Sequence, residues 1–225
     1  MAPGNGGRTD VYLEIGAKKV FACAVDWPGW ARWGKTETDA LDALVAYGKR
    51  YARAVASARA GFKPPAGVDE LRVVERLKGN ATTDFGAPGI PRTADKRPLT
   101  AAELKRQTSL LEATWRTFDK AAAKAVGVKL TVGPRGGGRS LPKMEDHVFE
   151  AEGGYLHALG SRVPRPPEVA SVRKTILAAL AARATDKPLP DPNQVDPAKR
   201  WSPRFFIRRT AWHALDHAWE LEDRS

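Results

Sequence analysis

Hydrophobic and polar positions alternate over short distances in the first part of the chain. Residues 10–25 form two short β-prone runs separated by residues 16–18 (Gly-Ala-Lys), which predicts a β-hairpin. The Pro-Gly pair at residues 28–29 favours a tight turn before a third short strand that carries Trp30 and Trp33. Three strands are therefore expected before the first helix.

One helix and one further strand complete this region. Thr36 or Thr38 can cap a helix whose apolar positions end before Gly61. The run VDELRVVERL, residues 68–77, is typical of a strand. Residues 1–78 are therefore expected to form an α+β domain with the order β-β-β-α-β.

The hydrophobic period becomes helical in the second half of the chain. Residues 79–99 combine three Pro and three Gly with little periodicity, which predicts an interdomain linker. Thr100 and Glu103 then form a capping box. Residues 100–225 are expected to be an all-α up-down four-helix bundle. Its predicted helices run from Thr100 to Gly127, from about Lys143 to Leu159, from Pro166 to before Pro188, and from Ser202 nearly to the end.

Composition narrows the class of protein. The 225 residues carry a net charge of +11, which suggests an acidic partner, but no block of five or more like charges appears. The spread of charge along the chain indicates a basic surface exposed to solvent. Binding to nucleic acid is the less favoured interpretation. No apolar run reaches the roughly 18 residues of a membrane span, and residues 1–10 lack the apolar core of a signal peptide. The single cysteine, Cys23, fits a reducing compartment and a buried strand position. We therefore expect a cytoplasmic protein.

The candidate chemistry lies in the histidines. His213 and His217 are four residues apart in a predicted helix, so they share one face with Cβ atoms about 6 Å apart. Because two ligands rarely suffice for a metal, a third must come from another helix, and His147 lies close to the interior stripe of its helix. His157 falls on the opposite side. The carboxylates that can orient these rings are Glu150, Asp216 and Glu220. The same spacing also fits the alternative that His213 and His217 are two ordinary histidines on a helix face that bind no metal.

The segments RRTAWHALDHAWELEDR and DHVFEAEGGYL resemble the DinB-like family of four-helix bundles. The resemblance covers residues 101–225 and implies a divalent metal ion, Zn, Ni, Fe or Mn, held by His147, His213 and His217. It also implies a reaction of the family's kind, such as S-transfer from a low-molecular-weight thiol or a mycothiol-dependent isomerisation. In such a reaction an open metal position holds the thiol as thiolate.

The segment KKVFACAVDWPGWARWGKTETDALDALVAYGKRY is similar to the HicB-like antitoxin domain. The likeness rests on the turn at residues 28–29, on Gly34 and on Thr36 before the helix. Trp30 and Trp33 depart from the usual turn, and no toxin-binding or DNA-binding tail is evident. The resemblance implies a small module that binds a partner or covers the mouth of the bundle.

Three further features each allow two interpretations. The glycine-rich loop of residues 131–142, with Arg135 and Arg139, is either a connection or an anion cradle. A helix face of Trp212, Leu215 and Trp219 serves core packing or a homodimer interface. The cluster of Arg204, Arg208 and Arg209 either binds an anion or forms salt bridges.

Two classes of function stay open on the sequence. The first is an enzyme, a metal-dependent thiol S-transferase, isomerase or hydrolase that acts on a small molecule. The second is a non-catalytic interaction protein whose HicB-like module binds a protein or nucleic acid. The second class predicts an exposed patch around Trp30 and Trp33.

Overall fold

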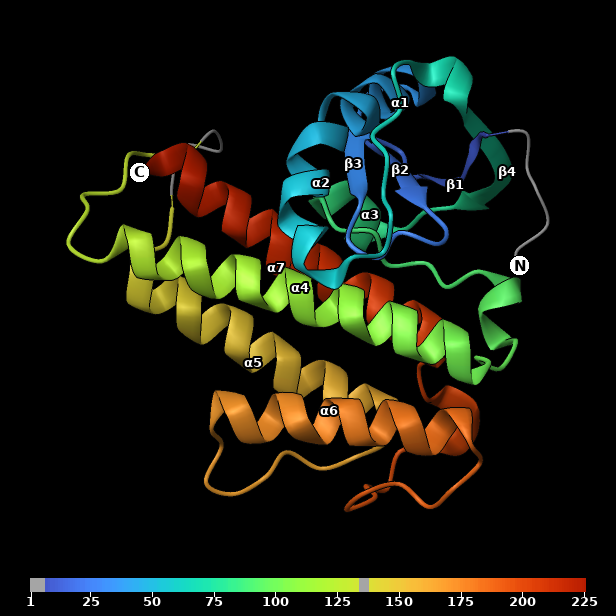
Figure 1. The fold of residues 1–225 in the computed structure, drawn as a ribbon, viewed down its shortest axis with the longest axis vertical. Helices are drawn as coiled ribbons and strands as arrows, with labels where there is room; N and C mark the ends of the chain where they lie inside the picture. The colour runs from blue at the N-terminus through green and yellow to red at the C-terminus, as the bar shows by residue number, and fades with distance from the viewer. Residues whose placement is uncertain (1–6, 134–137) are drawn as a thin grey trace.

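The computed structural model describes residues 7–133 and 138–225, in which a mixed sheet is followed by helices (Figure 1). The strands are β1 (Thr9–Ile15), β2 (Val20–Ala24), β3 (Ala31–Gly34) and β4 (Leu71–Lys78). The sheet order is β3-β2-β1-β4; β4 is parallel to β1, and the other pairs are antiparallel. The predicted hairpin and the four-stranded α+β unit are confirmed. Residues 68–70 form a 3₁₀ turn, so the last strand begins at Leu71.

Side chains from other parts of the chain cover both faces of the sheet. All five residues of β2 are therefore apolar and buried. Val11 and Leu13 point to one face, where they pack in a cluster with residues of the following helices. Tyr12 and Phe21 point to the other face, where they pack in a cluster with Trp212. Cys23 is buried in the same cluster, as predicted.

The region predicted as one helix contains two. α1 (Glu37–Ala46) begins at the Thr36 capping box, and α2 (Gly48–Val55) follows after Tyr47. The break falls at Tyr47, and a Cβ on Gly48, the first residue of α2, would lie only 3.2 Å from Pro64, so the loop after α2 passes close to the start of that helix. α1 packs on β2 and β3 through buried residues such as Ala40 and Leu44, and α2 packs on the later helix α4 (Ala101–Ala125).

Residues 79–99 contain two short helical segments, α3 (Ala81–Phe85) and a 3₁₀ turn (Thr93–Lys96). The buried carboxylate of Glu14 on β1 accepts hydrogen bonds from Thr83, Gly89 and Ile90, which holds this connection against the sheet. Its other end is held against the C-terminal helix by an ion pair between Asp95 and Arg208.

Four long helices form the rest of the protein. They are α4 (Ala101–Ala125), α5 (Leu141–Leu159), α6 (Val169–Ala184) and α7 (Pro203–Arg224), and each contacts the other three. The caps at Thr100 and Ser202 form as predicted, whereas the third helix begins at Val169, after the proline pair. α4 and α7 lie side by side between residues 9–78, the sheet unit, and the helices α5 and α6, and most residues of α7 are buried (Figure 1).

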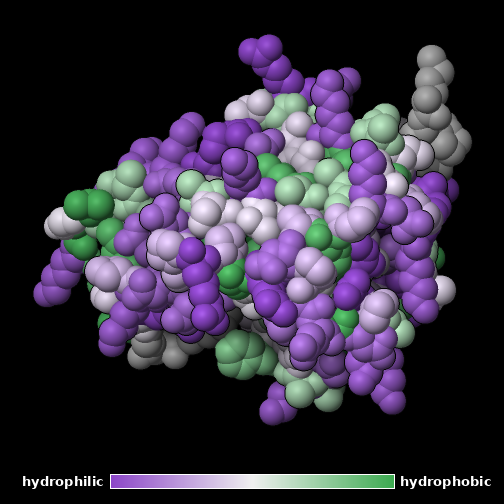
Figure 2. Space-filling model, turned by 90° about the horizontal axis from the view of Figure 1, so that it is seen from below, coloured by the Kyte–Doolittle hydropathy of each residue, from purple (hydrophilic) through white to green (hydrophobic). Residues whose placement is uncertain are grey.

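The surface seen from below in Figure 2 is mostly hydrophilic, and its hydrophobic residues lie in small separate groups. Within the two described stretches, no helix combines the length and the apolar character that a membrane crossing needs. Arg135 of the glycine-rich loop lies outside the described residues.

Candidate metal centre

The three predicted histidines lie together in the structure. His213 and His217 are on α7, and His147 reaches them from α5. The Nε2 atoms of His147 and His213 are 3.2 Å apart, and one nitrogen from each of the three rings lies within 4.8 Å of the others. The cluster forms because α5 packs along the face of α7 on which the one-turn spacing places both histidines.

Burial keeps the rings of His147 and His213 uncharged. His213 and His217 are 7% and 8% exposed, and His147 is half-buried. Burial, together with His217 and the positive charge of Arg139, lowers the pKa of His147 to about 4. Burial, followed by His217 and Arg209, places the pKa of His213 well below its usual range. At neutral pH both rings therefore offer imidazole lone pairs, the form that binds metals.

Of the three carboxylates proposed to orient the rings, Glu220 occupies that position. Its Oε2 lies 3.0 Å from Nδ1 of His217, and its Oε1 accepts a hydrogen bond from Arg224. The hydrogen bond with His217 is the main reason that the pKa of Glu220 is lowered. The prediction for the other two is wrong, because Asp216 pairs with Arg32 at 3.2 Å and Glu150 points into solvent. His157 is exposed and lies against Asn193, outside the cluster, as expected.

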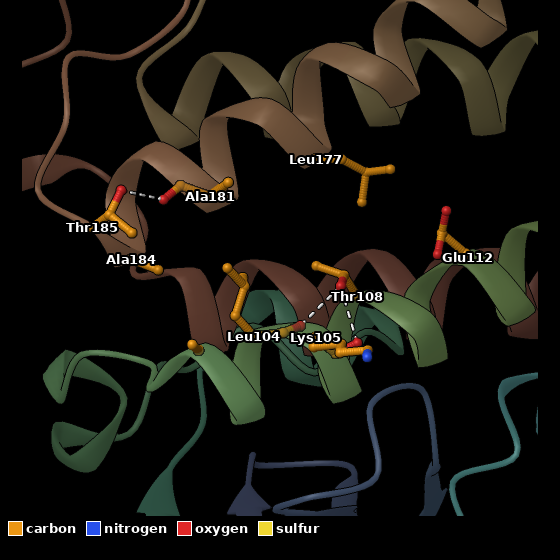
Figure 3. Close-up of a pocket in the computed structure, with 9 residues that line it drawn as sticks. Leu104, Lys105, Thr108, Glu112, Leu177, Ala181, Ala184 and Thr185 are labelled. Carbon is orange, nitrogen blue, oxygen red and sulfur yellow. Dashed lines mark hydrogen bonds between the residues drawn. The ribbon is translucent and has the colours of Figure 1, made fainter.

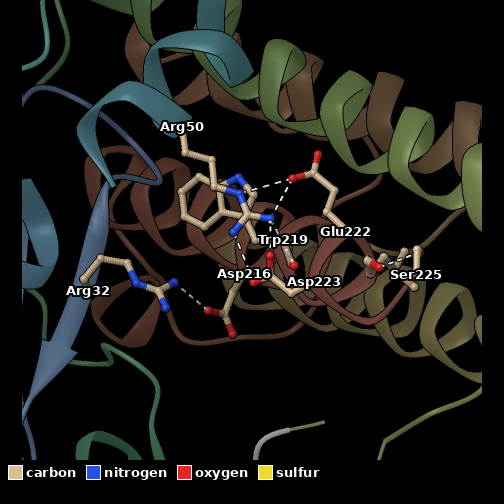
Figure 4. Close-up of polar contacts among 8 residues, drawn as sticks. Arg32, Arg50, Asp216, Trp219, Glu222, Asp223 and Ser225 are labelled. Atoms are coloured by element: carbon tan, nitrogen blue, oxygen red, sulfur yellow. Dashed lines mark hydrogen bonds and ion pairs between the residues drawn. The ribbon is translucent and has the colours of Figure 1, made fainter. Parts of the chain in front are cut away.

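Two arginines of the sheet unit form ion pairs with the C-terminal half of α7, which carries His217 (Figure 4). Arg32 on β3 pairs with Asp216, the residue before His217. Arg50 on α2 pairs with Glu222 and Asp223 and donates to the backbone carbonyl of Trp219. Neither contact could be predicted from local patterns, since the partners are 169–184 residues apart in the chain.

A cavity of about 720 Å³ opens beside His217. Arg32, Trp33 and Tyr47 of the sheet unit line one side, and Trp219 and Glu220 of α7 line the other. A cavity of this size is within the range of small-molecule sites. The side chains of the sheet unit therefore form part of the wall of the space next to the histidines.

The prediction that Trp30 belongs to an exposed patch is wrong. This ring is 1% exposed, stacks on Tyr51 and donates a hydrogen bond to the carbonyl of Leu44. The turn before it packs directly on α7, since a Cβ on Gly29 would approach Leu215 to 2.9 Å and the backbone of Ala211 to 3.1 Å. Trp33 is 37% exposed, and it lines the cavity beside His217.

The remaining residues singled out on α7 serve packing and ion pairing. Leu215 and Trp219 pack with the α1–α2 face of the sheet, and Trp212 meets Phe21 on the opposite face in an edge-to-face contact. Core packing within the chain is thus confirmed for this face. The salt-bridge interpretation holds for two of the three arginines: Arg204 pairs with Glu103, and Arg208 pairs with Asp95. Arg209 instead lies over the rings of Trp212 and Tyr155.

A second cavity, of about 290 Å³, lies between α4 and α6 (Figure 3). Its lining is mainly alanine and leucine and includes neither histidine nor cysteine. The hydroxyls of Thr108 and Thr185 already donate to carbonyls of their own helices, at Leu104 and Ala181. This cavity lacks the convergent polar groups of a reactive site.

Three imidazoles with a supporting carboxylate can hold a divalent cation. In a site with metal–nitrogen bonds of about 2.0 Å and tetrahedral angles, two ligand nitrogens lie about 3.3 Å apart, close to the separation of His147 and His213. Neither family models, nor curated proteins, nor solved structures yield a match to this chain.

Proposed function

We propose that His147, His213 and His217 bind a divalent metal ion, Zn, Ni, Fe or Mn, and that the protein is a metal-dependent enzyme acting on a small molecule. One observation carries the proposal: three imidazoles from two helices, two of them buried and one half-buried, converge on one point. In the described chain, no carboxylate pairs with the rings of His147 and His213. Desolvating ring nitrogens that lack a charged partner costs free energy, and a bound cation offsets that cost.

The reaction class follows from the proposed resemblance of residues 101–225 to DinB-like bundles. Contacts among all four helices α4–α7 support that architecture, and the strand order supports a HicB-like fold for residues 1–78. In this proposal the protein is a cytoplasmic thiol S-transferase, a mycothiol-type isomerase or a hydrolase. The ion, when bound, supplies Lewis acidity and lowers the pKa of a bound thiol or water.

The chain's own residues prepare the site for such chemistry. Glu220 accepts from Nδ1 of His217, which fixes the ring and leaves its Nε2 to bind metal. Arg224 holds Glu220 in place through its other oxygen. Trp33 and Tyr47 narrow the access of water from the cavity side.

The alternative of a non-catalytic interaction protein has less support. The exposed patch that this alternative predicts does not include Trp30, because Trp30 is buried in the core. The sheet unit also packs against α4 and α7, which leaves less of its surface for a partner. We therefore rank the metal-dependent enzyme first and keep binding of protein or nucleic acid as the second proposal.

The proposal is tested by elemental analysis of the untagged protein beside the His213→Ala/His217→Ala double variant. His157→Ala is the matched control, because it removes a histidine outside the cluster. We expect close to one metal ion per chain in the parent and the control and none in the double variant, with all three folded by circular dichroism. Equal metal content in parent and double variant would contradict the proposal. A screen of small thiols with electrophiles then identifies the reaction.

A further inference from the structure

The cavity beside His217 has an unbalanced set of charges. Each of its carboxylates already has a guanidinium partner: Asp216 pairs with Arg32, Glu220 with Arg224, and Asp223 with Arg50. The positive charges of the lining are therefore not all neutralised from within the cavity, and a bound divalent ion would add to the excess.

Arg139 carries part of this excess. Its side chain lines the cavity and makes no hydrogen bond or ion pair with the residues that the structure describes. A guanidinium presents paired N–H donors that match a carboxylate.

Aromatic side chains form the neighbouring walls. Trp33 leaves 37% of its surface exposed, and the ammonium of Lys19 lies 4.8 Å from its ring centroid. The rings of Tyr47 and Trp219 are in contact, with centroids 5.1 Å apart. The cavity thus combines flat apolar surface with cationic groups, and its volume of about 720 Å³ suits a small organic molecule.

We infer that this cavity binds a small organic anion, with its carboxylate on Arg139 and its apolar part against Trp33. The inference rests on the proposed function only for the role of this anion as a substrate, because the contacts named here do not involve the metal. It makes the sheet unit part of substrate selection: Trp33 comes from β3 and Arg139 from the loop before α5.

Benzoate and benzyl alcohol test the inference as a matched pair, since they share a ring and differ in charge. Their affinities are measured by ligand-observed NMR on the full chain, both as purified and after EDTA treatment. We expect benzoate to bind at least about tenfold more tightly than benzyl alcohol, with or without EDTA treatment, which is the scale of one charge-assisted contact. Arg139→Gln should abolish that preference, and Trp33→Ala should weaken both ligands.

Arg53→Gln is the control, because Arg53 is an exposed arginine of α2 that does not line the cavity. Equal affinity for the two ligands, or an unchanged preference in Arg139→Gln, would overturn the inference. Metal content measured on the same preparations separates the two proposals. A charge preference without metal binding overturns the metal proposal alone, and metal binding without a charge preference overturns this inference alone.

Discussion

Two kinds of buried polar group occur in this protein, and they differ in how the chain satisfies them. The buried carboxylates of Asp95 and Glu152 each face an arginine, Arg208 and Arg173 respectively. The buried histidines mainly face one another, with Glu220 as the carboxylate that reaches a ring. The acids are therefore satisfied by the protein itself, whereas the histidines retain unused lone pairs.

We expect the ion-paired acids to stabilise the fold and the histidines to serve ligand binding. A buried ion pair destabilises the fold strongly when one partner is removed, because the other charge stays desolvated. Neutral imidazoles that lack strong partners contribute little to folding, so their convergence is better explained by a ligand. Substitutions at the two kinds of site should consequently have opposite signatures.

The largest effect on stability is expected for Asp95→Asn. The substitution leaves Arg208 buried without its counter-charge and should lower the free energy of unfolding by about 3 kcal/mol or more. Urea unfolding measures this loss. The control is Glu37→Gln, which breaks the exposed pair with Arg76 and should cost less than about 1 kcal/mol. Equal costs for the two variants would remove the distinction between buried and exposed pairs.

Glu220→Ala should weaken metal binding without abolishing it. Loss of the carboxylate frees Nδ1 of His217 and lets the ring turn, which for such supporting groups lowers metal affinity by about 10- to 100-fold. Calorimetric titration with Zn²⁺ measures the change. Asp216→Ala is the matched control on the same helix, since Asp216 pairs with Arg32, and its affinity for Zn²⁺ should stay within about threefold of the parent. A larger loss in the control than in Glu220→Ala would contradict the assigned roles.

Glu103→Gln should give a smaller and pH-dependent effect. Partial burial alone would raise the pKa of Glu103, but hydrogen bonds from Thr100 and Arg204 outweigh it and lower the pKa to about 2. A lowered pKa means that the ionised carboxylate stabilises the fold above its unfolded value near 4.3 and loses this effect as the pH falls through about 2. The variant should therefore be less stable by about 1 kcal/mol at pH 7, on the scale of a helix cap.

The same pair of proteins can be compared by urea unfolding at pH 7 and at pH 3. The difference between parent and variant should shrink at the lower pH. A difference that is constant over this range would show that the ionised carboxylate has no part in capping α4.

The smallest effect on stability is expected for His213→Leu in metal-free protein. The ring is buried and meets His147 as its hydrogen-bonding neighbour, so an apolar side chain of similar size should change the free energy of unfolding by less than about 1 kcal/mol. Added Zn²⁺ should raise the melting temperature of the parent and not of the variant. A loss comparable to that of Asp95→Asn would make the histidines structural.

Local patterns in the sequence predicted much of this arrangement. The hairpin at residues 16–18 and the caps at Thr100 and Ser202 depend on neighbouring residues, and all three are present. The histidine cluster also followed from helical spacing, because α7 carries two of the residues on its buried face and α5 carries the third close to its interior stripe.

Contacts between distant segments left no signal in the sequence. Pro64 approaches Gly48 at the start of α2, and Trp30 is buried against Tyr51 beside the turn that packs on α7. The pairing of Asp216 with Arg32 likewise required the docking of the sheet unit on α7. Spacing along α7 placed Asp216 beside the histidines, but it could not show whether the carboxylate would pair with a histidine ring or with Arg32.

X-ray absorption spectroscopy of the Zn²⁺-loaded protein tests the central claim most directly, because it identifies the ligand atoms around the ion. Three imidazole nitrogens at about 2.0–2.1 Å in the parent, and no protein-bound zinc in the His213→Ala/His217→Ala variant, are the predicted result. A spectrum with sulfur ligation, or with oxygen ligands alone and no change in the double variant, would contradict the account.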